Sequence, residues 1–324
     1  MPRMLLSGLL AAGLFCALPA SAASGCMLFA DGTGKPVSTQ GDCAAQLTPA
    51  STFKIPLALM GYDSGFLVDE QLPALPFKAG DPDFLPEWKQ TTTPSSWMQF
   101  SVIWYSQRLT EWLGEARFQH YVDSFDYGNR DLEGNQGKHD GLTQAWLSAS
   151  LAISPQEQAR FLGKMVSGKL PVSAKTLRHT ANLMRQPDID GWQIHGKTGM
   201  GYPKLLDGSL DREQQIGWFV GWASKQDKTL IFVHTVIQKP GKQFASLRAR
   251  GGGVRRPAGP VEDTLMPATP APCAGFFIPL HHYFTLPHPP FTRPRHTPVQ
   301  QQGDVSWSNR FSPTRSPCCC CSAC

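Results

Sequence analysis

The sequence lacks an apolar run long enough to cross a membrane as a helix. A spanning helix needs about 20 apolar residues, and the apolar stretch near the N-terminus, residues 4–18, is shorter. Charge of one sign is also scarce, because the net charge is only +5 over 324 residues, which does not indicate a nucleic-acid partner. No ligand set typical of a zinc site is evident. We therefore expect no stable membrane anchor, no nucleic acid and no metal.

Residues 1–23 have the pattern of a secretory signal peptide. Arg3 supplies the positive start, an apolar stretch follows, and Ala20-Ser21-Ala22 is a small-residue cleavage site. Export predicts a periplasmic protein, in a compartment that permits disulfides.

Two cysteines, Cys26 and Cys43, remain in the body of the chain up to residue 250. Residues 26–30 and 35–38 are predicted strands around a turn at 31–34, so the two sulfurs could approach one another. A disulfide is the hypothesis. Two separate buried thiols, or lipidation of Cys26, are the alternatives that the sequence leaves open.

Residues 251–324 differ in composition from the rest of the chain. They contain 13 of the 28 prolines and no lysine, and they have neither helical nor alternating periodicity. We predict a disordered tail of out-of-frame or run-on sequence, with the domain boundary at residue 250.

The sequence pattern of the body, residues 24–250, predicts strands, then helices, then strands again. Ser154 and Glu157 form a capping box, and Ser173 is a further candidate cap. The helical patterns cover 97–121, 157–166 and 173–184, and the later strands cover 192–198, 217–223 and 230–237. This order indicates a mixed α/β (α+β-like) fold in which an antiparallel sheet (24–60 and 190–250) is flanked by a helical region (61–189).

Ser51 and Lys54 form an S-x-x-K motif at the predicted start of a helix. A spacing of three places both side chains on one helix face. A serine hydroxyl needs a base to become a nucleophile, and a lysine can be that base only where burial keeps its amine neutral. Alone, the motif favours a helix N-cap followed by a solvated lysine.

Three later motifs favour the catalytic interpretation: Ser101-Val102-Ile103, Tyr127-Gly128-Asn129 and Lys197-Thr198-Gly199. With S-x-x-K, their order resembles that of serine β-lactamases and penicillin-binding proteins. The Tyr-Gly-Asn element and the apolar Ile103 resemble class D β-lactamases (oxacillinases). The resemblance covers residues 25–250. It implies a transpeptidase-like fold and the hydrolysis of small-molecule β-lactam antibiotics.

The resemblance also implies the catalytic roles. Ser51 would form the acyl-enzyme, and Lys54 would carry a carbamate made from carbon dioxide (N6-carboxylysine) as the general base, with no other cofactor. Ser101 would relay a proton to the departing nitrogen, and Lys197 would lend positive charge to that relay.

Further residues are implied to bind substrate or to support the site. The backbone N–H groups of Ser51 and Met200 would form the oxyanion hole, and the Trp146 indole would donate to the carbamate. The implied substrate-binding residues are Thr198, Gly199, Met200 and Arg248, and the implied supporting residues are Ile103, Trp146, Tyr127 and Asn129. His195 is expected to be a strand residue and not a catalyst.

Several alternatives stay open at this point. A penicillin-binding DD-peptidase would share the chemistry, and a non-hydrolytic β-lactam sensor module would share the motifs. The resembling family has a C-terminal helix on the sheet, expected after Arg248, where this chain has glycines and prolines. We therefore expect an exposed sheet face and a loss of stability or activity. The chain could be a monomer or a homodimer, and its substrate spectrum is undetermined.

Overall fold

The computed structural model describes residues 25–205, 207–241 and 243–253. The predicted signal peptide, residues 1–23, and the predicted tail from residue 254 onward lie outside these ranges. Within the described ranges, no helix combines the length and apolar character that a membrane span requires.

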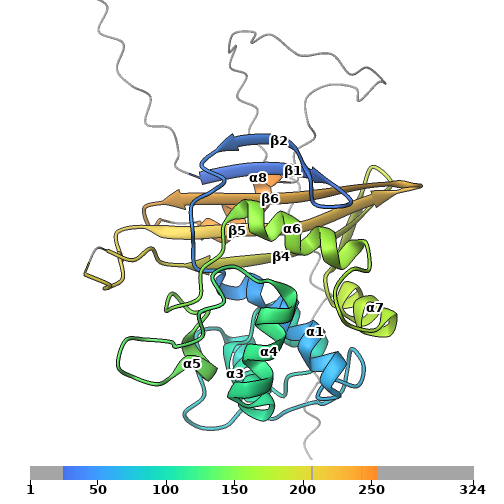
Figure 1. The fold of residues 1–324 in the computed structure, drawn as a ribbon. Helices are drawn as coiled ribbons and strands as arrows, with labels where there is room; N and C mark the ends of the chain where they lie inside the picture. Colours follow the sequence, from blue (N-terminus) through green and yellow to red (C-terminus); the bar gives the residue numbers. More distant parts are fainter. Residues whose placement is uncertain (1–24, 206, 242, 254–324) are drawn as a thin grey trace, which may run out of the picture. The chain divides into compact units, whose positions relative to one another are not determined.

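The described residues contain a six-stranded antiparallel sheet with the order β2-β1-β6-β5-β4-β3. Its layout confirms the predicted antiparallel sheet flanked by helices (Figure 1). The strand β3 was not predicted, because four of its five residues are exposed and it has no apolar alternation. The strands are β1 (Gly25–Asp31), β2 (Pro36–Gly41), β3 (Arg185–Ile189), β4 (Trp192–Gly201), β5 (Gln215–Lys225) and β6 (Lys228–Gln238).

The helical region lies below β4 in Figure 1, while α6 crosses one face of the sheet and α8 the other. This arrangement leaves the start of α1 beside the middle of β4, where the site described below is found. The helices are α1 (Lys54–Ser64), α2 (Pro94–Phe100), α3 (Ile103–Leu113), α4 (Glu115–Phe125), α5 (Gly141–Gln144), α6 (Pro155–Val166), α7 (Ala174–Leu183) and α8 (Ala245–Gly253), with short 3₁₀ helices η1 (Ala50–Phe53) and η2 (Pro86–Lys89).

The helical pattern predicted over 97–121 was wrong as one continuous element. The chain breaks it into α2, α3 and α4, with positive φ at Ser101 (58°) and Gly114 (73°). The apolar spacing runs across both breaks because Trp97, Trp104 and Phe118 all reach the same core. The first break projects Ser101 out of the helical pattern.

Helix α8 covers the sheet face that the sequence predicted to be exposed, so that prediction was wrong for the described part. Ala245 and Ala249 are fully buried, and Ala249 packs with Phe219 and Phe232. A Cβ on Gly217 would lie 2.1 Å from the Ala245 backbone, so glycine permits the helix to dock. Packing of Ala245 and Ala249 against the sheet holds the helix, which runs past the boundary predicted at residue 250 to Gly253.

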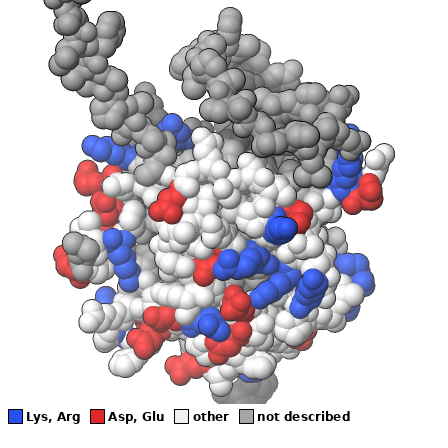
Figure 2. Space-filling view, turned by 45° about the horizontal axis from the view of Figure 1, so that its top comes forward, with Lys and Arg blue, Asp and Glu red and all other residues white. Residues whose placement is uncertain are grey.

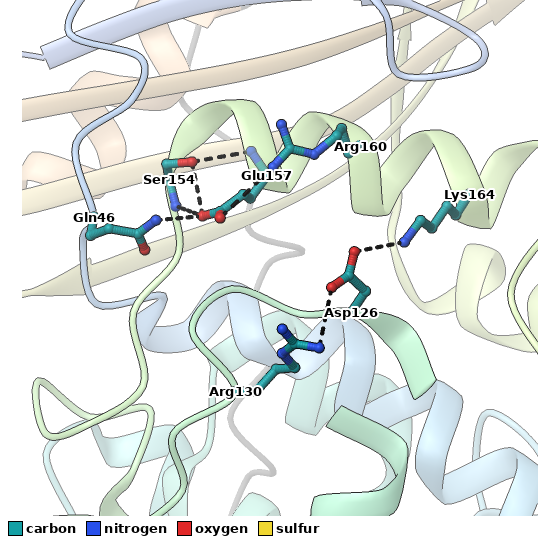
Figure 3. Close-up of polar contacts among 7 residues, drawn as sticks. All are labelled: Gln46, Asp126, Arg130, Ser154, Glu157, Arg160 and Lys164. Carbon is teal, nitrogen blue, oxygen red and sulfur yellow. Dashed lines mark hydrogen bonds and ion pairs between the residues drawn. The ribbon is translucent and has the colours of Figure 1, made fainter. Parts of the chain in front are cut away.

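Polar contacts fix α6 at both ends (Figure 3). The predicted capping box is confirmed: Ser154 Oγ accepts from Glu157 N, and Glu157 Oε2 accepts from Ser154 N at 2.8 Å. Toward the other end of α6, Lys164 donates to Asp126 at 3.2 Å. Because Asp126 immediately precedes Tyr127, α6 is tied directly to the Tyr-Gly-Asn segment.

Surface charge is mixed on the face shown in Figure 2, where basic and acidic side chains lie among wide areas of uncharged surface. Opposite charges meet in several exposed pairs, for example Lys89 with Asp83 at 2.9 Å. Each such pair contributes little to stability.

Cys26 and Cys43 are joined in a disulfide. It connects β1 to the segment after β2, and both residues are buried. A sulfur held in this bridge is not free for lipidation, the alternative raised for Cys26.

Replacing Cys43 with alanine should lower the free energy of unfolding by about 3 kcal/mol. The bridge closes a loop between positions 17 residues apart, and loops of about this length restrict the unfolded chain by that amount. Urea unfolding of wild type and variant measures the difference. Equal unfolding midpoints would show that the two thiols are not joined.

Candidate active site

Ser51 lies in η1, which continues directly into α1. The backbone N–H of Lys54 donates to the Ser51 and Thr52 carbonyls, which sets Ser51 and Lys54 one turn apart. Pro49 is the N-cap of this unit and no side chain caps it, so the hydroxyl of Ser51 is not used as a helix cap. Strand β4 passes close by, because a Cβ on Gly199 would lie 3.0 Å from the Pro49 carbonyl oxygen.

Lys54 has a buried amine that makes no hydrogen bond within the described residues. Its side chain is 1% exposed, and its Nζ has no hydrogen-bond partner among the described residues. Burial, followed by the positive charge of Lys197, holds the pKa of Lys54 well below its usual range. The amine is therefore poised to be neutral, which the base role requires.

Trp146 has a second orphaned polar atom in this region. The residue is fully buried and its Nε1 has no partner in the described part of the chain. Its ring stacks on Phe53 with centroids 5.6 Å apart, and Phe118 packs against it edge-on at 6.2 Å. Since Phe53 precedes Lys54, the indole belongs to the apolar surroundings of the α1 start.

Ser101 and Lys197 meet across the site. Lys197 Nζ donates to Ser101 Oγ at 2.6 Å and to the Thr198 carbonyl at 3.0 Å. Lys197 is 4% exposed, and burial, followed by the charge of Arg250, lowers its pKa to about 7. The αL backbone of Ser101 orients its side chain toward β4. The structure thus brings together two residues that are 96 positions apart.

The Lys197-Thr198-Gly199 segment lies on a half-open strand. Strand β3 pairs with β4 only from Trp192 to His195, while β5 pairs with β4 from Gln193 to Gly201. From Lys197 to Met200, β4 therefore has one strand neighbour within the described ranges. The free backbone edge can accept an extended ligand by strand addition.

The Tyr-Gly-Asn segment is locked to the loop that follows Trp146. Asn129 Nδ2 donates to the Ser150 carbonyl at 2.9 Å, and Asn129 Oδ1 accepts from Ala152 N at 3.0 Å. Gly128 has φ +56°, and a Cβ there would lie 2.1 Å from the Ala152 oxygen. The segment therefore contacts the loop that follows Trp146 through both side-chain and backbone atoms.

Gln158 is a buried polar residue of this region that sequence reasoning missed. Its Nε2 donates to Thr52 Oγ1 at 3.0 Å and to the Tyr127 hydroxyl at 3.1 Å. It is fully buried on α6, so it joins the η1 turn of Ser51 to the Tyr-Gly-Asn segment. A glutamine at a core-facing position of an amphipathic helix is the signal that could have found it.

The remaining predicted residues lie at the margins. Ile103 begins α3 and packs, half-buried, against the core beside the fully buried Val102. His195 stacks on Trp222 with centroids 4.6 Å apart and lies in β4, as expected of a strand residue.

Two arginines on α8 differ in their surroundings. Arg248, the residue predicted from the resemblance, is exposed and donates to Gln238 Oε1 at 3.2 Å. Arg250 is half-buried, lies over the Phe219 ring at 5.9 Å, and lowers the pKa of Lys197 through its charge. Arg250 is therefore a second basic candidate that the sequence analysis did not consider.

The free energy of unfolding should rise between about pH 7 and about pH 9 more steeply in wild type than in Lys197→Met. The pKa of Lys197 is about 7 in the folded protein and about 10.4 when unfolded. Between these values the unfolded state binds more protons, so stability increases with pH, by at most about 1.4 kcal/mol per pH unit. Lys228→Met, at an exposed lysine of β6, is the control and should keep the wild-type slope. Identical slopes in all three proteins would contradict the burial of a titrating amine.

Comparisons with known proteins agree with this geometry. The model of the penicillin binding protein transpeptidase domain matches residues 25–258. The chain is 41% identical over 220 residues to β-lactamase OXA-9 of Klebsiella pneumoniae, covering 66% of this chain and 79% of that protein. It is 36% identical over 228 residues to β-lactamase OXA-1 of Escherichia coli, covering 68% and 79%. The crystal structure of the class D β-lactamase OXA-427 is similar, with 89% identity, a TM-score of 0.70, and coverage of 71% of this chain and 95% of that chain.

Proposed function

The chain belongs to the class D β-lactamases, and we propose that it opens the β-lactam amide of penicillin-type antibiotics through an acyl-enzyme on Ser51. Members of this class are serine hydrolases that confer antibiotic resistance. The observation that carries the proposal is the buried amine of Lys54, one helical turn after Ser51, which has a lowered pKa and no hydrogen-bond partner in the described ranges.

Acylation requires three events at this site. The Ser51 hydroxyl loses its proton to the base on Lys54, its Oγ bonds to the lactam carbonyl carbon, and the carbon–nitrogen bond of the ring breaks. The ring nitrogen then takes a proton from Ser101, which Lys197 contacts at 2.6 Å. With a pKa of about 7, Lys197 can exist in both protonation states at neutral pH, as a proton relay needs.

The surroundings of Lys54 fit a carbamate. Among the residues that the structure describes, neither the buried Lys54 Nζ nor the buried Trp146 Nε1 has a hydrogen-bond partner, and buried polar atoms are normally satisfied. A carbamate formed on Lys54 from carbon dioxide would supply a carboxylate-like general base for acylation and deacylation. Trp146 would donate to it, and Phe53 and Phe118 would exclude water around it.

Substrate binding is assigned to the free part of β4 and to α8. The N–H groups of Ser51 and Met200 would stabilise the developing oxyanion, and such donors are worth about 3–4 kcal/mol each. Thr198 and Gly199 would align the substrate, and the positive charge of Arg248 or Arg250 would attract its carboxylate. We propose a periplasmic location and a monomer or homodimer.

Hydrolysis assays on purified residues 24–324 test the proposal. Benzylpenicillin and a chromogenic cephalosporin should both be turned over, and bicarbonate should raise the rate at mildly acidic pH, where a carbamate tends to be lost. Acylation without turnover would instead indicate the DD-peptidase or the sensor, and indifference to bicarbonate would indicate another base.

A further inference from the structure

Thr48 and Ser148 connect three segments of the active site through their hydroxyl groups. We propose that Ser148 is a positioning residue, which holds the end of β4, and with it the oxyanion donor Met200, against the loop of Trp146. This inference rests on the proposed acyl-enzyme chemistry and deepens it.

Thr48 connects the Trp146 loop to the turn of the nucleophile. Its Oγ1 donates to the Trp146 carbonyl at 3.0 Å and accepts from Ser148 N at 2.9 Å. The same Trp146 carbonyl accepts from Ala50 N at 3.1 Å, one residue before Ser51. Trp218 Nε1 on β5 donates to the Thr48 carbonyl at 2.9 Å, so the sheet also holds this segment.

Ser148 extends the connection to β4. Its Oγ accepts from the backbone N–H of Tyr202 at 3.0 Å, two residues after Met200. The approach is close, because a Cβ on Gly201 would lie 2.7 Å from Thr48 Cγ2 and 3.0 Å from Ser148 Oγ. The end of β4 therefore rests directly on these two side chains.

The backbone here is held in an unfavourable conformation. Ser148 has φ +59° and Ala50 has φ +48°, both in the left-handed region that disfavours residues with a Cβ. Ser148 is 6% exposed and Ala50 2%, so neither lies in a free surface turn. Strained residues persist where the surrounding bonds over-determine them, and such places cluster at functional sites.

The contacts separate two effects that a mutation can have. Ser148→Ala removes the acceptor of Tyr202 N but leaves both bonds to the Trp146 carbonyl. It should disturb the Met200 N–H without altering the surroundings of Lys54. Thr48→Val removes the hydrogen bonds of Thr48 Oγ1 to the Trp146 carbonyl and to Ser148 N. It should disturb both the Met200 N–H and the surroundings of Lys54. The oxyanion hole and the base are thus held by distinguishable parts of one network.

Ser150 offers a matched control two residues away. Its Oγ accepts from Gly134 N at 2.9 Å and donates to the Asp131 carbonyl at 2.9 Å, which is a comparable pair of bonds made to a different loop. Ser150→Ala should therefore lower stability about as much as Ser148→Ala without touching β4.

The test measures acylation by benzylpenicillin in rapid-mixing experiments on the full chain, together with the bicarbonate concentration that gives half-maximal activity. Ser148→Ala should acylate at least about tenfold more slowly, with an unchanged bicarbonate requirement. The acylation rate of Ser150→Ala should stay within about twofold of the wild-type rate, because its side chain does not contact β4 and so does not position the reacting atoms. Thr48→Val should change both the acylation rate and the bicarbonate requirement. Thr48→Ser keeps the hydroxyl and should keep the wild-type values of both.

Wild-type acylation in Ser148→Ala would overturn the inference, as would an equal loss in Ser150→Ala or a shifted bicarbonate requirement in Ser148→Ala. These outcomes are distinct from failure of the proposed function. In that case the wild-type protein itself would form no adduct on Ser51, and the inference would fall with it.

Discussion

Replacing Ser51 with alanine abolishes the turnover of benzylpenicillin and leaves the fold intact. The variant has no hydroxyl to acylate, and removing a catalytic nucleophile lowers kcat by a factor on the order of 10⁴ to 10⁶. Stability should change by no more than about 0.5 kcal/mol, because Ser51 does not cap its helix. Steady-state hydrolysis and urea unfolding measure the two quantities.

Ser64→Ala provides the matched control, since Ser64 lies at the other end of the same helical unit and its hydroxyl donates locally, to the Gly61 carbonyl. It should keep wild-type turnover. Turnover by Ser51→Ala comparable to that of Ser64→Ala would exclude Ser51 as the nucleophile.

Replacing Lys54 should stop the enzyme after its first half-reaction. Without a base, acylation becomes slow and water is no longer activated, so the acyl-enzyme accumulates. Loss of a positioned general base typically lowers rates 10²- to 10⁴-fold. The mass of the intact Lys54→Ala protein after mixing with benzylpenicillin should show the added substrate, whereas wild type should return to its original mass.

Lys54→Met separates chemistry from packing. Methionine fills similar space without a polar group, and burying an unsatisfied polar group is costly. In buffer free of bicarbonate, we expect this variant to resist urea at least as well as wild type while also accumulating adduct. Fast turnover in either Lys54 variant would be incompatible with the scheme.

The chemical motifs could be predicted from the sequence because each is local or lies at an element boundary. Ser51 and Lys54 are one turn apart in any helical conformation, and the Ser154 cap follows from residues three positions apart. The disulfide required only two neighbouring strands. These features depend on short-range geometry, which the sequence pattern expresses directly.

The features that the sequence did not predict depend on long-range packing. Ser101 lies within a continuous apolar periodicity, so the break that directs it to Lys197 depends on tertiary contacts. Helix α8 forms despite its glycines because Ala245 and Ala249 find a complementary sheet face. The contacts of Gln158 and Ser148 join residues 31 to 106 positions apart, and no local pattern encodes such partners.

The most direct test of the central claim is carbon-13 NMR of the protein equilibrated with carbon-13 bicarbonate. The claim is that Lys54 presents an uncharged amine to carbon dioxide beside Ser51. It predicts a carbamate carbon resonance in wild type that disappears on acidification and is missing in Lys54→Ala. Absence of the resonance in wild type, or its persistence in Lys54→Ala, would contradict the account.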